Sequence, residues 1–418
     1  MERALLVTIK LNSERDFWPI EDVAEELEAL ALTSGAEIVD NIICKRDKPT
    51  PNLFIGTGKT QEIAFLSEEN NIETVIFSHN LSGTQQRNLE EIIGKKTIDH
   101  TQLILDIFSR HAKTPEGKMQ VELAQLQYLM PRLVGKGIML SRLGGGIGTR
   151  GPGEQKLEVD RRRIRKKIDK LKEDLRHLSL HRQTIRKKRK ENAIPQVALV
   201  GYTNAGKSTL LNALTGAGQI VTDSLFTTLD PLSKSLRLPQ GENIIISDTV
   251  GFLHNLPHHL IEAFKATLEE VVEADLLVHV LDASHSRVYE HAKAVLIVLK
   301  ELQADKKPVI TALNKIDLLD DKIWLARLKE DFSNSIPLSA KLNQNLELLL
   351  KEIQKNFQTG MVKIKVFIPH PRMELLDLLY RQGRVEETKY CQKGVKVKVN
   401  LPKVLASKLL QNKEIKIQ

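Results

Sequence analysis

Residues 196–215 constrain the fold more than any other segment, because a phosphate-binding loop there joins an apolar run to a helical pattern. The loop GYTNAGKS at 201–208 fits the pattern G-x-x-x-x-G-K-[ST] at every position. Its glycines let backbone N–H groups surround phosphate oxygens, and the following helix points its positive end at them. We therefore predict a P-loop α/β domain over residues 194–356, in which Lys207 reaches the β- and γ-phosphates and Ser208 ligates Mg²⁺.

Two further motifs predict how the metal and the γ-phosphate are held. The strand IIISD runs into DTVG at 248–251, where Asp248 is expected to hold Mg²⁺ through a water and Gly251 to contact the γ-phosphate through its N–H. The loop FTTLDP at 226–231 offers hydroxyls, and Thr228 is the predicted second protein ligand of Mg²⁺. That bond would order the loop only while the γ-phosphate is present, which makes the loop a switch.

The choice of base is predicted by NKID at 314–317 and SAK at 339–341. The Asp317 carboxylate can accept from guanine N1–H and its exocyclic amine, a pair of donors that adenine lacks. Lys315 is expected to pack its stem along the base, and the Ala340 N–H to reach the guanine oxygen. The predicted nucleotide contacts are Gly201, Tyr202, Thr203, Asn204, Ala205, Gly206, Lys207, Ser208, Phe226, Thr227, Thr228, Leu229, Asp230, Asp248, Thr249, Val250, Gly251, Asn314, Lys315, Ile316, Asp317, Ser339, Ala340 and Lys341.

The residue after DTVG predicts a site that hydrolyses slowly by itself. Ras-like enzymes have a Gln there that orients the attacking water, whereas this chain has Phe252, which cannot. The residues left to act on the reacting phosphate are Lys207, Thr228 and Gly251, and a partner must supply the rest. Asn204 is like the Asn through which some GTPases recruit K⁺, so K⁺ is a second candidate cation beside the Mg²⁺ of Ser208 and Thr228.

The positive charge of the chain is concentrated in one segment. The whole chain carries a formal charge of +9, and residues 160–192 alone hold 15 Lys or Arg against 5 Asp or Glu. Such a stripe favours a polyanion, most plausibly nucleic acid, over an ordinary solvated helix face. Cys44 and Cys391 are expected to be reduced thiols. With no apolar run long enough to span a bilayer and no signal core, we expect a cytoplasmic monomer without stable membrane insertion.

The basic segment also carries the period of packed helices. Residues 101–192 hold two heptad stripes joined by a glycine-rich loop at 143–156, which predicts an antiparallel helical hairpin. The loop contains six glycines and is flanked or occupied by Arg142, Arg150 and Lys156. We favour RNA contact by this tip over a passive connector. The stripe residues are Met119, Leu123, Leu126, Met130 and Leu133, then Leu157, Ile164, Ile168, Leu171, Leu175, Leu178 and Ile185.

The two ends of the chain predict small separate domains. Residues 1–100 alternate apolar runs at 4–10, 36–43, 52–55 and 74–78 with helical patterns, which indicates an α/β domain with a largely parallel sheet. Residues 360–418 read strand, helix, two strands and helix, which fits a small α+β domain. The overall fold class is thus α/β, with the P-loop domain between these two.

Two glycine-rich segments are rejected as further nucleotide sites. GIGTRG at 146–151 fits the dinucleotide pattern, but it follows a helix and lies in no βαβ unit. IGTGKT at 55–60 looks like half a phosphate loop, but Leu53 stands where its first glycine should be. We therefore predict no ATP binding at 55–60.

With these motifs in view, the chain resembles the HflX family of ribosome-associated GTPases over nearly its whole length. The resemblance rests on FIGTGK, LSGTQQRNLE, TQLILDIF, EGKMQVELAQLQYLMPRL, GGGIGTRGPGE with KLEVDRRRIR, the phosphate loop, FTTLDP, and DTVGF followed by LPHHLIEAFKATLEE. Most of these lie outside the nucleotide domain, so the likeness is specific to the family. A departure is Gln155, where the family pattern leads us to expect Thr.

The resemblance implies a fold and a partner. It implies an N-terminal α/β subdomain (1–100), a hairpin (101–192), the GTPase domain (194–356) and a C-terminal domain (360–418). It also implies binding to the large ribosomal subunit, with the tip toward the peptidyl-transferase region. In that family the GTP form splits idle or stalled ribosomes, and hydrolysis stimulated by the ribosome releases the factor. A ribosome-assembly GTPase and a non-ribosomal regulator whose hairpin binds protein remain alternatives.

Overall fold

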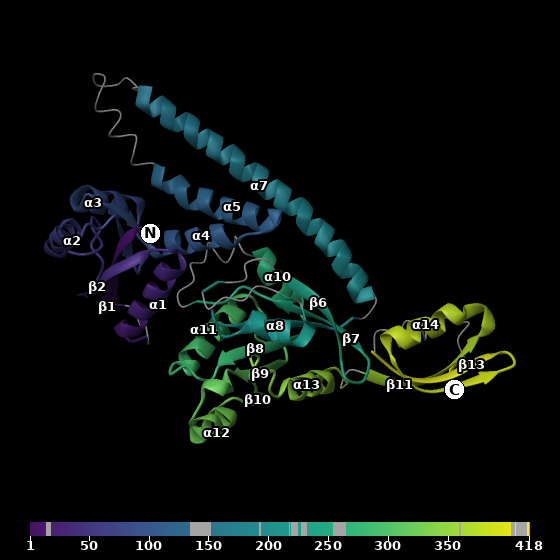
Figure 1. Cartoon of the computed structure of the whole chain (residues 1–418). Helices are drawn as coiled ribbons and strands as arrows, with labels where there is room; N and C mark the ends of the chain where they lie inside the picture. The colour runs from purple at the N-terminus through teal and green to yellow at the C-terminus, as the bar shows by residue number, and fades with distance from the viewer. Residues whose placement is uncertain are drawn as a thin grey trace. The chain divides into compact units, whose positions relative to one another are not determined.

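The computed structural model describes residues 1–13, 18–133, 152–191, 194–216, 218, 225–226, 232–253, 265–358, 361–402, 406 and 416–417 (Figure 1). These residues belong to two compact units. The first consists of Met1–Leu178, Asp223–Leu229 and Leu256–Lys265, and the second of Ser179–Thr222, Asp230–Asn255 and Ala266–Gln418. None of the described helices is long and apolar enough to cross a membrane.

The first unit begins with a four-stranded sheet whose order is β2-β1-β3-β4, with every pair parallel. Its apolar core lies between the sheet and helices and includes Leu5, Val7, Ile63, Phe77 and Leu89. The parallel α/β arrangement predicted for the N-terminal region is confirmed. The elements are β1 (Arg3–Leu11), α1 (Ile20–Thr33), β2 (Glu37–Arg46), α2 (Thr57–Glu69), β3 (Thr74–Phe77), α3 (Gly83–Ile93), β4 (Lys96–Ile98) and α4 (His100–His111).

The strand predicted at 52–55 is wrong. Thr50 and Phe54 exchange backbone hydrogen bonds of 2.9 and 3.1 Å with each other in a tight turn, and Phe54 has a φ of 62°. Leu53, Phe54 and Ile55 are buried, so the apolar run fills the core instead of pairing with the sheet. The fourth strand is β4, whose three residues were too short a run to predict.

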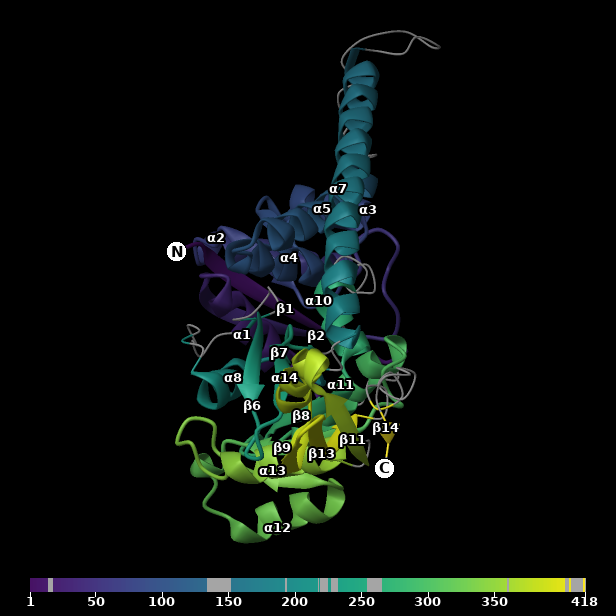
Figure 2. The same ribbon diagram turned by 90° about the vertical axis from the view of Figure 1, so that its right-hand side faces the viewer.

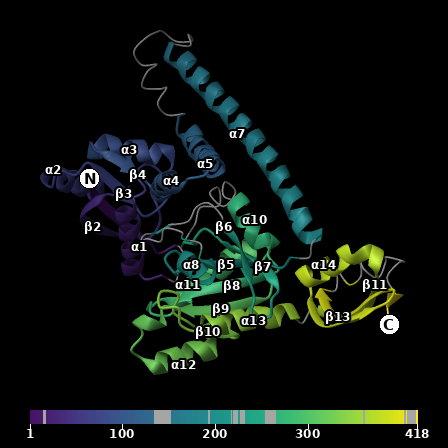
Figure 3. The ribbon, with the colours of Figure 1, turned by 45° about the vertical axis from the view of Figure 1, so that its right-hand side comes forward.

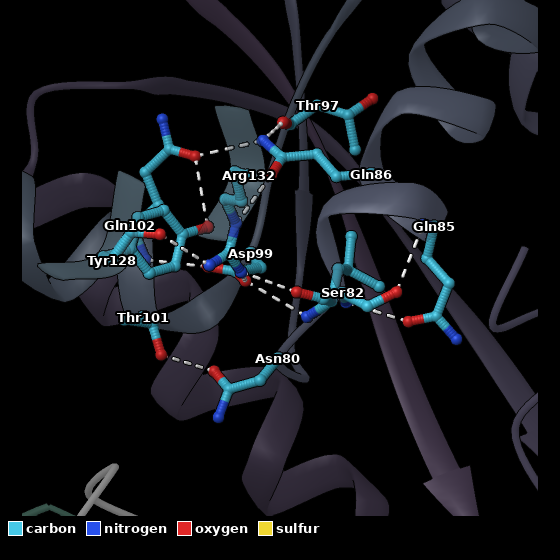
Figure 4. A network of polar contacts seen from close by, with 11 residues as sticks. Asn80, Ser82, Gln85, Gln86, Thr97, Asp99, Thr101, Gln102, Tyr128 and Arg132 are labelled. Atoms are coloured by element: carbon cyan, nitrogen blue, oxygen red, sulfur yellow. Dashed lines mark hydrogen bonds and ion pairs between the residues drawn. The ribbon is translucent and has the colours of Figure 1, made fainter. Parts of the chain in front are cut away.

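A polar network fastens the next helix, α5 (Pro115–Arg132), to the end of this sheet (Figure 4). Asp99 follows β4, is fully buried, and accepts from the backbone N–H of Gln102 at 2.8 Å and of Leu81 at 3.1 Å. Arg132 at the end of α5 donates to the same carboxylate at 2.9 Å and to the Leu81 carbonyl at 2.6 Å. Its guanidinium also lies 3.4 Å from the ring centre of Tyr128.

The predicted hairpin is formed by α5 and α7 (Pro152–Glu191), which are drawn side by side in Figure 1 and whose long second helix stands out in Figure 2. The 40 residues of α7 make a helix about 60 Å long. The two predicted stripes meet where Leu123, Ile168 and Leu171 are buried, with Met119, Leu126, Met130, Ile164 and Leu175 packed around them. The loop residues Arg142 and Arg150 lie outside the described residues.

The second unit contains a six-stranded sheet of order β10-β9-β8-β5-β7-β6, parallel except for the pair β6 and β7. Helices α8 (Lys207–Thr215) and α13 (Leu346–Gln358) pack on one face, where Leu210 and Ile353 join Val197 and Val280 in the core. Helix α11 (Val288–Glu301) covers the other face, because its residues Val288 and Ala292 share a core cluster with Leu281 of β8. The strands are β5 (Gln196–Gly201), β6 (Leu232–Arg237), β7 (Asn243–Asp248), β8 (Leu276–Asp282), β9 (Val309–Asn314) and β10 (Ser335–Pro337).

Helices connect these strands in the manner of an α/β domain, as predicted for residues 194–356. They are α8 (Lys207–Thr215), α10 (Lys265–Glu273), α11 (Val288–Glu301), the 3₁₀ turn η2 (Ile316–Leu318), α12 (Lys322–Asp331) and α13 (Leu346–Gln358). Parallel strands bring their carboxyl ends to one edge of the sheet, and ligands of such folds bind at that edge.

The chain ends in a smaller antiparallel sheet of order β12-β13-β11-β14. The predicted succession of strand, helix and two strands is confirmed, and α14 lies on one face of the sheet (Figures 1 and 3). The helix predicted at 403–411 lies outside the described residues, except for Ala406, which is helical. The elements are β11 (Met361–Pro369), the 3₁₀ turn η3 (His370–Arg372), α14 (Met373–Gln382), β12 (Arg384–Cys391), β13 (Gly394–Pro402) and β14 (Lys416–Ile417).

Candidate nucleotide-binding site

The loop between β5 and α8 depends on glycine where other parts of the site come close. A Cβ on Gly201 would lie 2.3 Å from the Val280 carbonyl oxygen, and one on Gly206 would lie 2.3 Å from Asn314 Nδ2. Gly206 also has a φ of 90°, which residues with a side chain rarely adopt. These contacts explain the glycines of the pattern and leave the backbone of 201–208 wrapped around the start of α8.

Lys207 lies inside this loop. Its Nζ donates to the carbonyls of Gly201 at 3.2 Å and Tyr202 at 2.8 Å, and the side chain is buried. Burial lowers the pKa of Lys207 to about 8, against a smaller opposing effect of the Asp248 carboxylate. A buried ammonium with only carbonyl partners is incompletely compensated, and phosphate oxygens at this position would compensate it.

Two residues predicted to hold Mg²⁺ meet although 40 positions separate them. Ser208 Oγ donates to Asp248 Oδ2 at 2.6 Å, and Asp248 Oδ1 accepts from the Thr249 N–H at 3.0 Å. Thr249 is fixed in turn by its hydroxyl, which donates to the Leu199 carbonyl at 2.7 Å. A hydroxyl beside a buried carboxylate is the kind of oxygen donor set that Mg²⁺ prefers, so these residues fit the metal.

The segment after Asp248 returns to the phosphate loop. The Thr203 N–H donates to the Phe252 carbonyl at 2.9 Å, and the Phe252 N–H donates to the Gly201 carbonyl at 3.2 Å. A Cβ on Gly251 would lie 2.8 Å from Thr203 Cα and 3.2 Å from Lys207 Nζ, so only glycine fits. The Phe252 side chain is 1% exposed, which leaves it no access to an attacking water.

Asn314 ties the base-recognition segments to the phosphate loop. Its Nδ2 donates to the Ala205 carbonyl at 2.9 Å, and its Oδ1 accepts from the Ala340 N–H at 3.0 Å. Lys315 has a φ of 63°, and its Nζ forms an ion pair of 2.7 Å with Asp282 Oδ2. The motifs predicted at 201–208, 314–317 and 339–341 are therefore brought together.

Asp317 has an acceptor that no described residue satisfies. Its Oδ1 is buried and has no hydrogen-bond partner among the described residues. An orphaned buried carboxylate oxygen is costly, and a pair of ligand N–H groups would satisfy it. The Ala340 N–H, predicted to reach the base, here donates to Asn314, so a bound base would have to share or replace that bond.

The structure also describes Phe226, Ile316 and Lys341, three further predicted contact residues. Phe226 belongs to the first unit, where it is buried and packs edge-on against Phe108 with ring centres 4.5 Å apart. Ile316 begins η2, and Lys341 is exposed. The remaining residues of the switch loop lie outside the described residues: Thr227, Thr228, Leu229 and Asp230.

Several side chains near the loop were not predicted. Asp282 pairs in register with Asn314 across β8 and β9, a neighbour relation that chain order does not reveal. The Tyr202 ring stacks on His291 at 3.9 Å, and His285 lies 4.4 Å from His291. Burial, and then the neighbouring His285, lowers the pKa of His291 to about 3. His279, buried in β8, has a pKa lowered to about 4 by burial and then by the charge of Lys207.

Known families match the chain in three consecutive parts. Residues 21–109 match a family described as GTP-binding GTPase N-terminal, residues 111–189 the GTP-binding GTPase middle region, and residues 196–315 the 50S ribosome-binding GTPase family. A GTP-binding protein of Sulfolobus solfataricus solved with GDP is 27% identical, with a TM-score of 0.43, over 85% of this chain and 98% of that one.

Relatives that match over most of their own length indicate the same family at higher identity. GTPase HflX of Caldanaerobacter subterraneus subsp. tengcongensis is 46% identical over 96% of this chain and 91% of its own length. GTPase HflX of Escherichia coli is 40% identical over 96% of this chain and 94% of its own length. With a phosphate loop, a buried Asp317 oxygen that no described residue satisfies and this likeness over 96% of its length, the chain binds GTP and GDP and belongs to the HflX family of GTPases.

Proposed function

We propose that this protein is a Mg²⁺-dependent GTPase that binds the large ribosomal subunit and separates the subunits of idle or stalled ribosomes. Hydrolysis is stimulated by the ribosome and resets the factor. The observation that carries the proposal is the burial of Phe252 beside a phosphate loop in which Lys207, Ser208 and Asp248 are already positioned. A site that holds its nucleotide but lacks a side chain to orient water needs a partner in order to turn over.

The phosphates are held by groups already positioned in the loop. Lys207 exchanges its carbonyl partners at Gly201 and Tyr202 for β- and γ-phosphate oxygens. The bound phosphates favour the charged form of this lysine, which reverses the effect of burial on its pKa. The Gly251 N–H contacts the γ-phosphate, and the close approach of Gly251 to Lys207 Nζ supports this role.

Ser208 and Thr228 would hold Mg²⁺, and Asp248 would reach it through a water. When bound, the metal would supply positive charge that neutralises the phosphate oxygens. The short bond between Ser208 and Asp248 supports this role, because both oxygens are in place before the metal arrives. Asn204 is the candidate residue for recruiting K⁺ as a further charge near the phosphates.

Guanine is selected by the Asp317 carboxylate, with Lys315 along the base and Ala340 near its oxygen. The support is the buried Asp317 Oδ1 without a partner among the described residues, which matches the two N–H donors of guanine. Asn314 does not read the base in this proposal. Its two hydrogen bonds hold the base-recognition segments against the phosphate loop.

The hairpin contacts ribosomal RNA. Most Lys and Arg side chains described between 161 and 176 on α7 are exposed, while the apolar stripe of the same helix faces α5. These charged side chains can therefore contact phosphates, because they do not pack between the two helices of the hairpin. The match of residues 196–315 to a family described as 50S ribosome-binding supports the large subunit as the partner. A ribosomal partner in turn supports a cytoplasmic location.

Sedimentation of the protein with ribosomes and a non-hydrolysable GTP analogue tests the proposal. Co-migration with large subunits together with loss of intact ribosomes is expected. Co-migration only with immature particles would favour a ribosome-assembly GTPase. No co-migration with either would leave a regulator whose hairpin binds protein. GDP in place of the analogue is the matched control and should not separate the subunits.

A further inference from the structure

The C-terminal sheet has two faces of opposite character. Along β11, Ile364, Val366 and Ile368 are buried, whereas Lys363 and Lys365 between them are exposed. Strand β13 repeats the alternation, with buried Val395, Val397, Val399 and Leu401 and the polar residues Lys396, Lys398 and Asn400 between them. Successive residues of a strand point to opposite faces, so the lysines of both strands share one face.

The apolar face is the one that α14 covers. Leu376 and Leu379 of α14 are buried with Val366, Val397 and Val399 in a single core. Figures 1 and 3 show α14 lying against this sheet. The hydroxyl of Tyr380 on α14 lies 2.8 Å from the hydroxyl of Thr388 on β12. The face of β12 that carries Thr388 is therefore also turned toward the helix. The lysine-bearing face is therefore the face of the sheet opposite α14.

Strand register gathers the lysines into cross-strand rows. Phe367 lies opposite Lys396, which lies opposite Lys389 on the other side. In the next row Lys365 lies opposite Lys398, which has Glu387 opposite it on its other side. Like charges directly opposite each other destabilise a sheet, so the paired lysines do not stabilise this one. A row of this kind indicates an anionic partner.

The acidic residues of the face neutralise only part of this charge. Glu386 forms ion pairs with Lys363 and, at 3.7 Å, with Lys398, and Glu387 forms one of 2.9 Å with Lys389. Among the described residues Lys365 and Lys396 form no ion pair. These two ammonium groups flank Phe367, which is only partly buried, so cations and an aromatic ring occupy neighbouring positions.

We propose that this face, formed by β11, β12 and β13, binds single-stranded RNA. Lys365 and Lys396 contact phosphates, and the Phe367 ring stacks on a base. Alternate residues of a strand lie about 6.8 Å apart, a spacing that an extended phosphate backbone can follow. A four-stranded sheet with an accessible aromatic ring among cations is a recurrent surface for unpaired RNA, because every base has a face to stack. This contact is separate from the hairpin contact and does not depend on ribosome splitting.

Fluorescence anisotropy of the full chain with a labelled 12-nucleotide single-stranded RNA of mixed sequence tests the proposal. The Lys365→Gln/Lys396→Gln variant should weaken binding and reduce the salt dependence. For single strands each lost phosphate contact lowers the slope of log K against log salt by about 0.7, so about 1.4 is expected here. Phe367→Leu keeps an apolar side chain but should weaken binding about tenfold.

The matched control is Lys322→Gln/Lys329→Gln on α12, which removes the same charge from exposed positions elsewhere and should leave the affinity near wild type. RNA carrying 4-thiouridine should crosslink to peptides of β11 or β13. The proposal is overturned if the face variants match the control, or if no crosslink falls in these strands. It is equally overturned if the variants keep RNA affinity but lose binding to large subunits, since the face would then contact protein.

Discussion

The guanidinium of Arg132 lies 2.9 Å from the carboxylate of Asp99, which is fully buried, and stacks on Tyr128 from the same helix. Arg132 is the last residue of α5, and Asp99 caps the first turn of α4. Burial and the Asp99 charge also raise the pKa of the Tyr128 phenol, which keeps that ring neutral. The pair therefore fixes where the first hairpin helix ends relative to the N-terminal sheet.

Arg132→Ala should loosen this attachment. Removing one member leaves the Asp99 carboxylate buried without its cation, a loss of about 3 kcal/mol for such pairs. Hydrogen exchange of the amides in α4 and α5 should speed up accordingly. Arg110→Ala is the control, because its ion pair with Asp106 is exposed and contributes little. Equal exchange in both variants would remove the pair from this role.

Asp317→Asn should move base preference from guanine toward xanthine. The amide offers a donor where the carboxylate offers only acceptors, and xanthine carries an oxygen where guanine carries an amine. Competition of GTP and XTP against a fluorescent GDP analogue measures the change. Asp320→Asn, an exposed neighbour, should behave as wild type. Unchanged selectivity for GTP in the Asp317 variant would mean that another residue reads the base.

Acidification should destabilise the second unit through His279. Its folded-state pKa of about 4 lies below the unfolded value of about 6.5, so the unfolded chain binds more protons between these values. The contribution of His279 to the free energy of unfolding is fully present above pH 6.5 and is lost as the pH falls toward 4. The free energy of unfolding of His279→Gln should depend less on pH in this window than that of wild type. The exposed His177 gives the control variant His177→Gln, which should follow wild type.

The tip of the hairpin should serve ribosome activity and not nucleotide binding. Replacing Arg150 and trimming the loop glycines should leave GTP affinity unchanged while weakening ribosome splitting, because phosphate contact needs the charge and the close backbone approach. Normal splitting by the loop variant would contradict an RNA-contacting tip. GTP affinity measured on the same preparation shows that the nucleotide domain is intact.

The sequence was most informative where a structure follows from local spacing. The heptad positions of Met119 and Leu123 predicted the seam in which they lie, because helical period alone decides which side chains share a face. The phosphate loop predicted the strand, turn and helix around Lys207 for the same reason. Its pattern specifies backbone geometry at each position.

Relations that depend on packing between distant segments could not be predicted. The ion pair of Lys315 with Asp282 follows from strand order in the sheet, which the sequence does not contain. The apolar run at Leu53 and Phe54 predicts a strand that is not formed, because hydrophobicity alone does not distinguish a pairing strand from a turn that fills the core. The lysine rows of the C-terminal sheet likewise needed the register of β11 against β13.

The rate of GTP hydrolysis with and without purified large ribosomal subunits tests the central claim most directly. Because Phe252 is buried and cannot orient water, we predict slow hydrolysis by the protein alone and a large stimulation by the subunits. The Lys207→Ala variant should show neither the slow hydrolysis nor the stimulation by the subunits. An equally fast rate without ribosomal subunits, or no stimulation at saturating subunits, would contradict this prediction.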